Sequence, residues 1–153
     1  MGTTGLEGVV AASTRLSHVD GERGDLVIRG FALEEIAGRA TFEETTWLMW
    51  HGELPTGAEL EGFRAALSEA REIPQSTIAV LRECARRHLD AMDALRMGVD
   101  TLSLEVNDEI GIVSRVPTIV AAYARLRRGL QPVPPRGELG HAANFLWMLS
   151  GEV

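Results

Sequence analysis

The chain has 153 residues, of which 45% are hydrophobic and 24% are charged, and its formal net charge is −7. This length suits one domain with a core of its own, and the composition is that of a globular protein rather than a disordered one. The negative charge argues against non-specific nucleic-acid binding, because it repels phosphates. No apolar run is long enough for a membrane helix, and Glu7 stands where a signal peptide would be apolar. We therefore expect a cytoplasmic protein that binds neither nucleic acid nor membrane.

Residues 9–31 favour extended structure and turns. Val9 and Val10 open this stretch, and the run Leu-Val-Ile at 26–28 is rich in β-branched residues. Between them, the segment 20–25 reads Asp-Gly-Glu-Arg-Gly-Asp, which supplies the glycines and aspartates that turns require. The pattern predicts an antiparallel hairpin or ribbon. Because isolated two-stranded ribbons are marginally stable, we expect it to pack on helices.

Beyond the predicted hairpin, the spacing of apolar residues is that of helices. Two capping boxes mark helix starts, one formed by Thr41 and Glu44 and the other by Thr56 and Glu59. Gly52 is placed to end the first of these helices in the left-handed conformation.

Four further helices follow in the prediction. One starts near Pro74, one is capped by Asp90, the longest covers 116–130, and the last begins near Leu139. The proline-rich segment 131–137 interrupts regular structure between the last two. The predicted fold is mainly α with a short N-terminal β-hairpin, in one domain over 1–153 without internal repeats.

The residues that could carry chemistry are scattered. The histidines (His18, His51, His88 and His141) have no metal-binding spacing, and we expect no metal site. The single cysteine, Cys84, cannot form an internal disulfide, and its helical setting favours a buried structural role over a nucleophilic one. For His51 we favour a role at the end of a helix, and for His141 a role in the core or an interface. The sequence thus assigns no catalytic residue, and the cofactor-binding residues stay unknown.

The sequence allows more than one role for a group of arginines and for a pair of tryptophans. Arginines near the end of the longest helix, with one more beyond it, could attract the phosphates of a cofactor or the carboxylates of a dicarboxylic acid. The commoner explanation is a solvated cluster that compensates the helix dipole. These arginines are Arg125, Arg127, Arg128 and Arg136. Of Trp47 and Trp50, one is expected at an interface, because both cannot share a narrow face with their neighbours.

Several segments, in the right order, resemble the citrate synthase family. They are Gly5–Val10 with Thr14–Ser17, Asp20-Gly21 with Leu26–Phe31, Phe42–Glu44 with Leu48 and His51–Thr56, Val116–Tyr123, and Gly140–Leu149. In one place the chain departs from the family pattern. Bacterial members usually have His-Pro-Met before an Asp-x-Leu-Arg helix, whereas this chain has Asp90-Ala91-Met92 before Asp93–Arg96.

The resemblance implies the helices of the family's large domain and the family's reaction. That reaction is the condensation of an acyl-CoA, most simply acetyl-CoA, with oxaloacetate to give citrate and CoA, and it needs no cofactor beyond these substrates. Family chains are more than twice as long, and their catalytic Asp and His residues lie in later motifs. The chain is therefore expected to be the N-terminal part of the large domain, inactive alone, in a homodimer or with a partner chain.

Two interpretations compete. In the first, the chain is a piece of a citrate synthase-like acyltransferase, as a truncated product or as one half of a split enzyme. In the second, it is a non-catalytic helical interaction module that assembles with a full-length or C-terminal citrate synthase chain. A DNA-binding helical domain is disfavoured by the charge and by the absence of a basic recognition helix.

Overall fold

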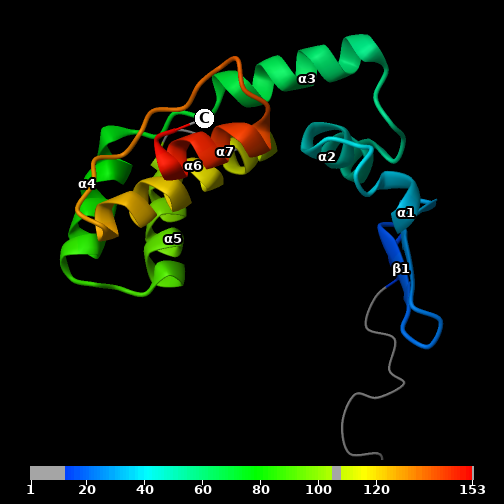
Figure 1. The fold of residues 1–153 in the computed structure, drawn as a ribbon, viewed down its shortest axis with the longest axis horizontal. Coiled ribbons are helices and arrows are strands. Elements are labelled where there is room, and N and C mark those ends of the chain that lie inside the picture. Colours follow the sequence, from blue (N-terminus) through cyan, green and yellow to red (C-terminus); the bar gives the residue numbers. More distant parts are fainter. Residues whose placement is uncertain (1–12, 105–107, 153) are drawn as a thin grey trace, which may run out of the picture. The chain divides into compact units, whose positions relative to one another are not determined.

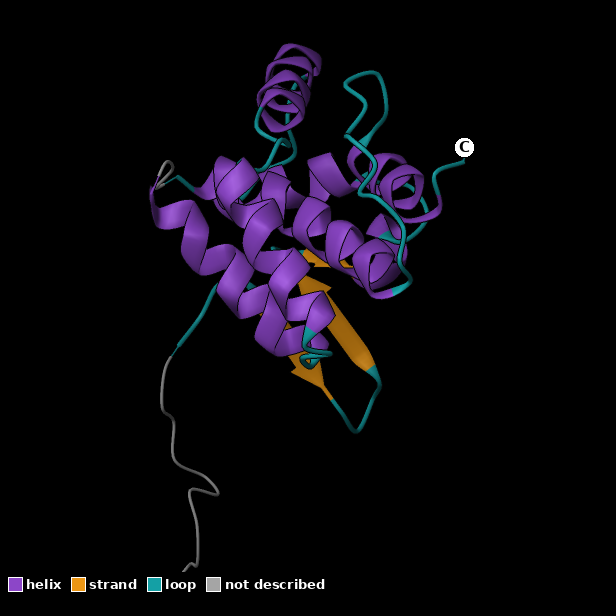
Figure 2. Ribbon diagram, turned by 90° about the vertical axis from the view of Figure 1, so that its left-hand side faces the viewer, coloured by secondary structure: helices purple, strands orange, loops and turns teal. Residues whose placement is uncertain are grey.

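The computed structural model describes residues 13–104 and 108–152. Helices make up most of these residues, and the strands form one small sheet (Figure 2). The contacts divide the chain into two compact units, Met1–Pro55 and Thr56–Val153. The predicted mainly α fold with a small β element is confirmed. Among the described helices, none has both the length and the hydropathy that crossing a bilayer requires.

The first unit contains the sheet and two helices, α1 (Leu33–Ile36) and α2 (Phe42–His51). Strands β1 (Ser17–Asp20), β2 (Asp25–Ile28) and β3 (Phe31–Ala32) pair antiparallel in the order β1-β2-β3. In the first turn, the carboxylate of Asp20 accepts hydrogen bonds from the backbone N–H groups of Glu22 and Arg23. The predicted hairpin is confirmed, whereas β3 was not predicted. Val9 and Val10 lie outside the described residues.

The turn between β2 and β3 is connected to α2 by Arg29. This residue has a left-handed backbone with φ +50°, and Gly30 follows with φ +92°. The Arg29 side chain donates hydrogen bonds from Nε and Nη2 to the carbonyl oxygen of Met49, at 3.1 and 2.6 Å. Since Met49 lies in the last turn of α2, a cation there also complements the helix dipole. The hairpin and α2 are thereby tied together.

Both predicted capping boxes are present. At the start of α2, Thr41 Oγ1 accepts the N–H of Glu44 and the Glu44 carboxylate accepts the N–H of Thr41. Thr56 and Glu59 repeat this arrangement at the start of α3 (Gly57–Glu69), the first helix of the second unit. Gly52 ends α2 with φ +89°, as predicted.

The second unit continues with α4 (Gln75–Arg86), α5 (Ala91–Asp100), the 3₁₀ helix η1 (Thr101–Leu104), α6 (Glu109–Arg127) and α7 (His141–Ser150). Helix α6 contacts α3, α4, α5 and α7, and it is the central element of this unit (Figure 1). The core between α4, α5 and α6 includes Leu81, Ala94, Ile119 and Tyr123. Pro74 and Asp90 immediately precede α4 and α5, in agreement with the predicted starts.

The longest helix differs from its prediction. It begins at Glu109 rather than near Val116, and Pro117 lies inside it. The start is set by Asp108, whose carboxylate accepts the N–H of Gly111 at 2.6 Å. The helix ends at Arg127, and Leu130, which was predicted to lie on its apolar face, is exposed beyond it.

Candidate functional site

Cys84 is a core residue. Its side chain is 1% exposed, and its Sγ lies 3.7 Å from the sulfur of Met97. Burial raises the pKa of the Cys84 thiol, because the charged thiolate is poorly solvated inside the protein. A thiol in this setting stays protonated and is a weak nucleophile. The predicted structural role is therefore confirmed.

The four histidines lie on separate elements. His18 is on β1, His51 is the last residue of α2, His88 lies between α4 and α5, and His141 is the first residue of α7. Within residues 13–104 and 108–152, no three His, Cys, Asp or Glu side chains are grouped so as to hold a metal ion. The His51 ring lies against Trp47, with 3.9 Å between ring centroids, while Gly52 provides the left-handed cap. His141 is 6% exposed, which agrees with a core role.

The four arginines singled out from the sequence do not converge on one anion site. Arg125 donates to the carbonyl oxygens of Gln131, Leu149 and Ser150, at 2.7, 3.4 and 3.0 Å. Arg127 donates from Nη1 to the Leu89 carbonyl oxygen and to the Tyr123 hydroxyl.

The other two arginines have different surroundings. The guanidinium of Arg136 lies over the Trp147 ring, 3.6 Å from its centroid, and Arg128 is exposed at the end of α6. Arg125 and Arg127 lie in the last turn of α6, where cations complement the helix dipole as predicted, and Arg125 also donates to carbonyl oxygens at the end of α7.

Arg71, which sequence reasoning missed, holds the loop between α6 and α7. Its side chain is buried and donates from Nη1 to the carbonyl oxygens of Arg136 and Leu139, at 2.7 and 2.8 Å. Its own carbonyl oxygen accepts the hydroxyl of Thr118. The side chain of Asn144 accepts the Arg136 N–H, and Trp147 donates to the Pro134 carbonyl. The proline-rich loop is thus fixed by Arg71, in the turn after α3, and by two side chains of α7.

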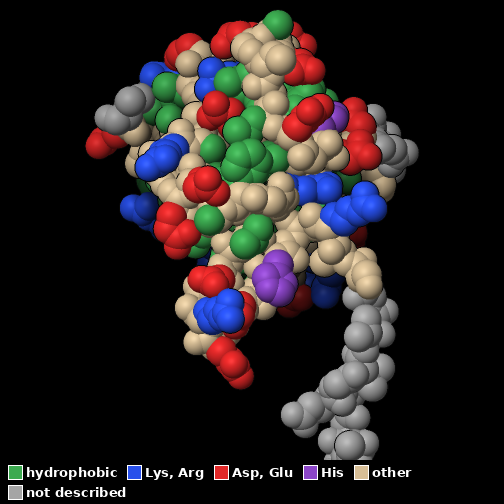
Figure 3. All heavy atoms as spheres, turned by 90° about the vertical axis from the view of Figure 1, so that its right-hand side faces the viewer, with side chains coloured by type: hydrophobic (Ala, Val, Ile, Leu, Met, Phe, Trp, Pro, Cys, Tyr) green, Lys and Arg blue, Asp and Glu red, His purple; other side chains and the backbone are tan. Residues whose placement is uncertain are grey.

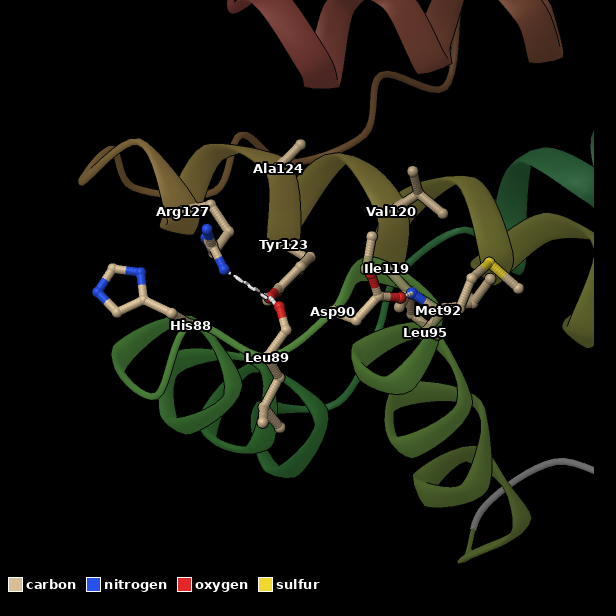
Figure 4. A pocket seen from close by; sticks show the side chains of 11 residues that line it. His88, Leu89, Asp90, Met92, Leu95, Ile119, Val120, Tyr123, Ala124 and Arg127 are labelled. Atoms are coloured by element: carbon tan, nitrogen blue, oxygen red, sulfur yellow. Dashed lines mark hydrogen bonds between the residues drawn. The ribbon is translucent and has the colours of Figure 1, made fainter.

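A cavity of about 560 Å³ lies between the α4–α5 connection, the start of α5 and the second half of α6 (Figure 4). Its walls are mostly apolar, and Leu95, Ile119 and Val120 contribute to them. The polar side chains in its lining are His88, Asp90, Tyr123 and Arg127. The Asp90 carboxylate accepts the N–H of Met92 at 2.8 Å, as the cap of α5. Sequence reasoning missed this cavity, because its two walls are far apart in the chain.

The exposed end of α4 has a compact charge cluster. The carboxylate of Glu83 accepts hydrogen bonds from Arg86 and Arg87, and their guanidinium groups lower the pKa of Glu83 to about 2.

On the face drawn in Figure 3, acidic and basic side chains are interspersed with hydrophobic ones. Among the described residues, the cysteine, the histidines and the arginines discussed above do not bring a nucleophile, a general base and an oxyanion donor together.

Comparison with known proteins identifies the relatives of this chain. A family profile described as "Citrate synthase, C-terminal domain" matches residues 5–153. The citrate synthase of Haloferax volcanii is 42% identical, over 97% of this chain and 43% of its own. "2-Methylcitrate synthase" of Mycobacterium tuberculosis is 36% identical, over 97% of this chain and 40% of its own. This chain therefore spans less than half the length of these relatives.

Solved structures give the same result. The crystal structure of citrate synthase from Pyrobaculum aerophilum matches 96% of this chain and 42% of its own, with a TM-score of 0.82 and 37% identity. A citrate synthase from Thermoplasma acidophilum, in a ternary complex with carboxymethyl coenzyme A and oxaloacetate, matches the same shares with a TM-score of 0.86 and 26% identity.

Proposed function

Because this chain belongs to the citrate synthase family, we propose that it is the N-terminal part of the large domain of a citrate synthase-like acyltransferase. The proposed reaction condenses an acyl-CoA, with acetyl-CoA foremost, with oxaloacetate to give citrate and CoA. The observation that carries the proposal is identity of 42% to a citrate synthase over 97% of this chain. The structure of the Thermoplasma relative, which holds a coenzyme A derivative and oxaloacetate, supports this substrate pair.

The chemistry needs groups that the described residues do not assemble. In the proposed reaction, a base removes a proton from the carbon beside the thioester carbonyl, and the resulting enolate, or the enol formed when its oxygen is protonated, attacks the keto carbon of oxaloacetate. The keto oxygen takes up a proton and becomes the hydroxyl group of the product. Water then cleaves the thioester and releases CoA. Base and enol-stabilising donors must lie within hydrogen-bond reach of the reacting atoms. The role that we propose for this chain is therefore architectural, and the chain alone is inactive.

The contacts of the second unit suit such a role. Arg71 fixes the loop before α7, and Arg125 fixes the last turn of α7. Helices held at both ends can support a site without contributing its reacting groups. We further propose that the complete enzyme is a cytoplasmic homodimer, or an assembly of this chain with a partner chain.

The experiment follows the release of free CoA thiol from acetyl-CoA or propionyl-CoA in the presence of oxaloacetate. The chain is assayed alone and mixed with a polypeptide that contains the remaining part of a citrate synthase relative. We expect no release by the chain alone and oxaloacetate-dependent release by the mixture. A reaction without oxaloacetate controls for simple thioester hydrolysis, and the remaining polypeptide alone is the second control. Activity of the chain alone would contradict the architectural role.

The second candidate is a non-catalytic helical module that assembles with a full-length or C-terminal citrate synthase chain. It is favoured by the contacts of Arg71, Arg125 and Arg127, which donate to backbone carbonyl oxygens and so stabilise the fold. In this case the mixture would form a complex, detected by analytical ultracentrifugation, without gaining activity.

A further inference from the structure

The cavity between the α4–α5 connection and α6 has two chemically different ends. Figure 4 shows Arg127 and His88 at one end and Met92 and Leu95 at the other. Its volume of about 560 Å³ lies in the range of small-molecule sites, roughly 300–1,000 Å³, which combine apolar walls with a few polar groups. An occupant that matches both ends has an apolar body and one charged group.

At the cationic end, Arg127 has N–H donors that could bind a ligand. Arg127 Nη1 donates to the Leu89 carbonyl oxygen at 3.1 Å and to the Tyr123 hydroxyl at 3.5 Å. Within the described part of the chain, Nε and Nη2 of Arg127 make no hydrogen bond, and no carboxylate lies within ion-pair distance. Arg127 is exposed, and the two contacts of Nη1 place its guanidinium beside Leu89 and Tyr123 of the lining. The free edge of this planar group is suited to a carboxylate, which accepts two parallel N–H bonds.

The other end combines aliphatic side chains with the carboxylate of Asp90 (Figure 4). Val120 on α6 and Leu95 on α5 line the cavity and are half-buried, so part of each side chain is accessible to an occupant, whereas Ile119 is fully buried. Met92 is 69% exposed, and its flexible thioether can close over an alkyl chain. The single carboxylate in the lining, Asp90, accepts a backbone N–H at the start of α5, where the helix dipole offsets its charge.

We propose that this cavity binds an aliphatic monocarboxylate of medium chain length. Its carboxylate lies on the free edge of Arg127, and its alkyl chain lies along Leu95, Val120 and Met92. The proposal does not rest on the proposed acyl transfer, because binding to this chain alone is sufficient to test it.

Sodium octanoate, below its micellar concentration, is titrated into the complete chain and followed by isothermal calorimetry and by NMR of the methionine methyl groups. We expect saturable binding that perturbs Met92, and about tenfold or greater weakening in Arg127→Gln, since a hydrogen bond to a charged group contributes about 1.5–3 kcal/mol. The matched control is Arg128→Gln, at the exposed neighbouring position outside the cavity, which should bind as the unmodified chain does. Neutral 1-octanol should bind more weakly than octanoate.

A second variant tests the cavity itself. Ala91→Phe, at an exposed position of the lining, should block octanoate binding while leaving the circular dichroism spectrum unchanged. Absence of saturable binding, or equal affinity in the Arg127→Gln and Arg128→Gln variants, would overturn the proposal. So would loss of octanoate binding on addition of the complementary polypeptide, because that result would identify the cavity as a packing surface for that chain.

Discussion

At Gly98, α5 approaches α6 so closely that a side chain does not fit. A Cβ atom at this position would lie 2.7 Å from Ile119 Cγ2 and 3.3 Å from Leu81 Cδ2. Both neighbours are completely buried, so neither can move into solvent. We expect Gly98→Ala to lower the free energy of unfolding by about 1–3 kcal/mol, the usual cost of overpacking a core.

The matched control for this prediction is Gly62→Ala. Gly62 also lies within a helix, α3, but a Cβ atom added there would meet no other atom within 4 Å. This change should be neutral or stabilising by up to about 1 kcal/mol, because alanine favours helix more than glycine does. Urea unfolding of the two variants measures the difference. Equal stability of Gly98→Ala and Gly62→Ala would contradict the close helix contact.

The charge cluster on α4 predicts a pH dependence. The pKa of Glu83 is lowered from 4.5 to about 2, first by its hydrogen bonds to Arg86 and Arg87. A carboxyl with a lower pKa in the folded state stabilises the fold above its unfolded pKa, and this contribution is lost as the pH falls from about 4.5 through about 2. An NMR titration of the Glu83 carboxyl carbon should therefore give a midpoint near 2.

Removal of the Arg86 and Arg87 guanidinium groups should reverse the lowering of the Glu83 pKa. In the double variant Arg86→Gln, Arg87→Gln, the Glu83 midpoint should return toward 4.5. A midpoint near 4.5 in the unmodified chain would show that these exposed ion pairs are too weakly held in solution to perturb the carboxyl.

On the scale of elements, the last turn of α7 depends on one side chain from α6. Arg125 donates to the carbonyl oxygens of Leu149 and Ser150, which lie in the turn where a helix leaves its carbonyl groups without partners of its own. We expect Arg125→Met to destabilise the chain by about 1–3 kcal/mol, because these hydrogen bonds involve a charged donor. Hydrogen exchange of the Gly151 amide, which donates to Trp147, should also become faster.

Arg128→Met is the control for this prediction, because Arg128 is an exposed arginine at the end of the same helix. It should change neither the stability nor the exchange of Gly151. Equal effects of the two substitutions would mean that general charge, rather than the contact with α7, determines the result.

The elements predicted best from the sequence are those whose signals are local. The boxes at Thr41 and Thr56, the cap at Asp90 and the turn after Asp20 involve residues within a few positions of each other. The start of α6 was missed because the apolar spacing is clear only after Val116, while the actual cap is Asp108. A proline inside a helix removes one N–H donor, and packing of α6 on its neighbours is sufficient to retain the helix around Pro117.

The candidate sites could be predicted less well, because they depend on contacts distant in sequence. Arg71 binds carbonyl oxygens more than sixty positions away, and no local pattern marks it. The cavity likewise combines the region of Asp90 with the second half of α6. Conversely, Cys84 could be assigned to the core from its place on an apolar helix face alone.

For the molecule as a whole, the family of the chain indicates a reaction, and the contacts of its described residues indicate which part of the enzyme the chain forms. The chain belongs to the citrate synthase family, yet it spans about 43% of the length of the Haloferax relative. In the helical framework of its described residues, Arg71, Arg125 and Arg127 donate to backbone carbonyl oxygens. We propose that this chain supports citrate synthesis without carrying the reacting groups.

Formation of citrate itself tests this claim most directly. The chain, the complementary polypeptide and their mixture are each given acetyl-CoA labelled with ¹³C in the acetyl group, together with oxaloacetate, and the products are identified by NMR. We expect labelled citrate from the mixture and none from either chain alone. Labelled citrate from this chain alone would show that the chain itself carries the reacting groups and would contradict the proposed architectural role.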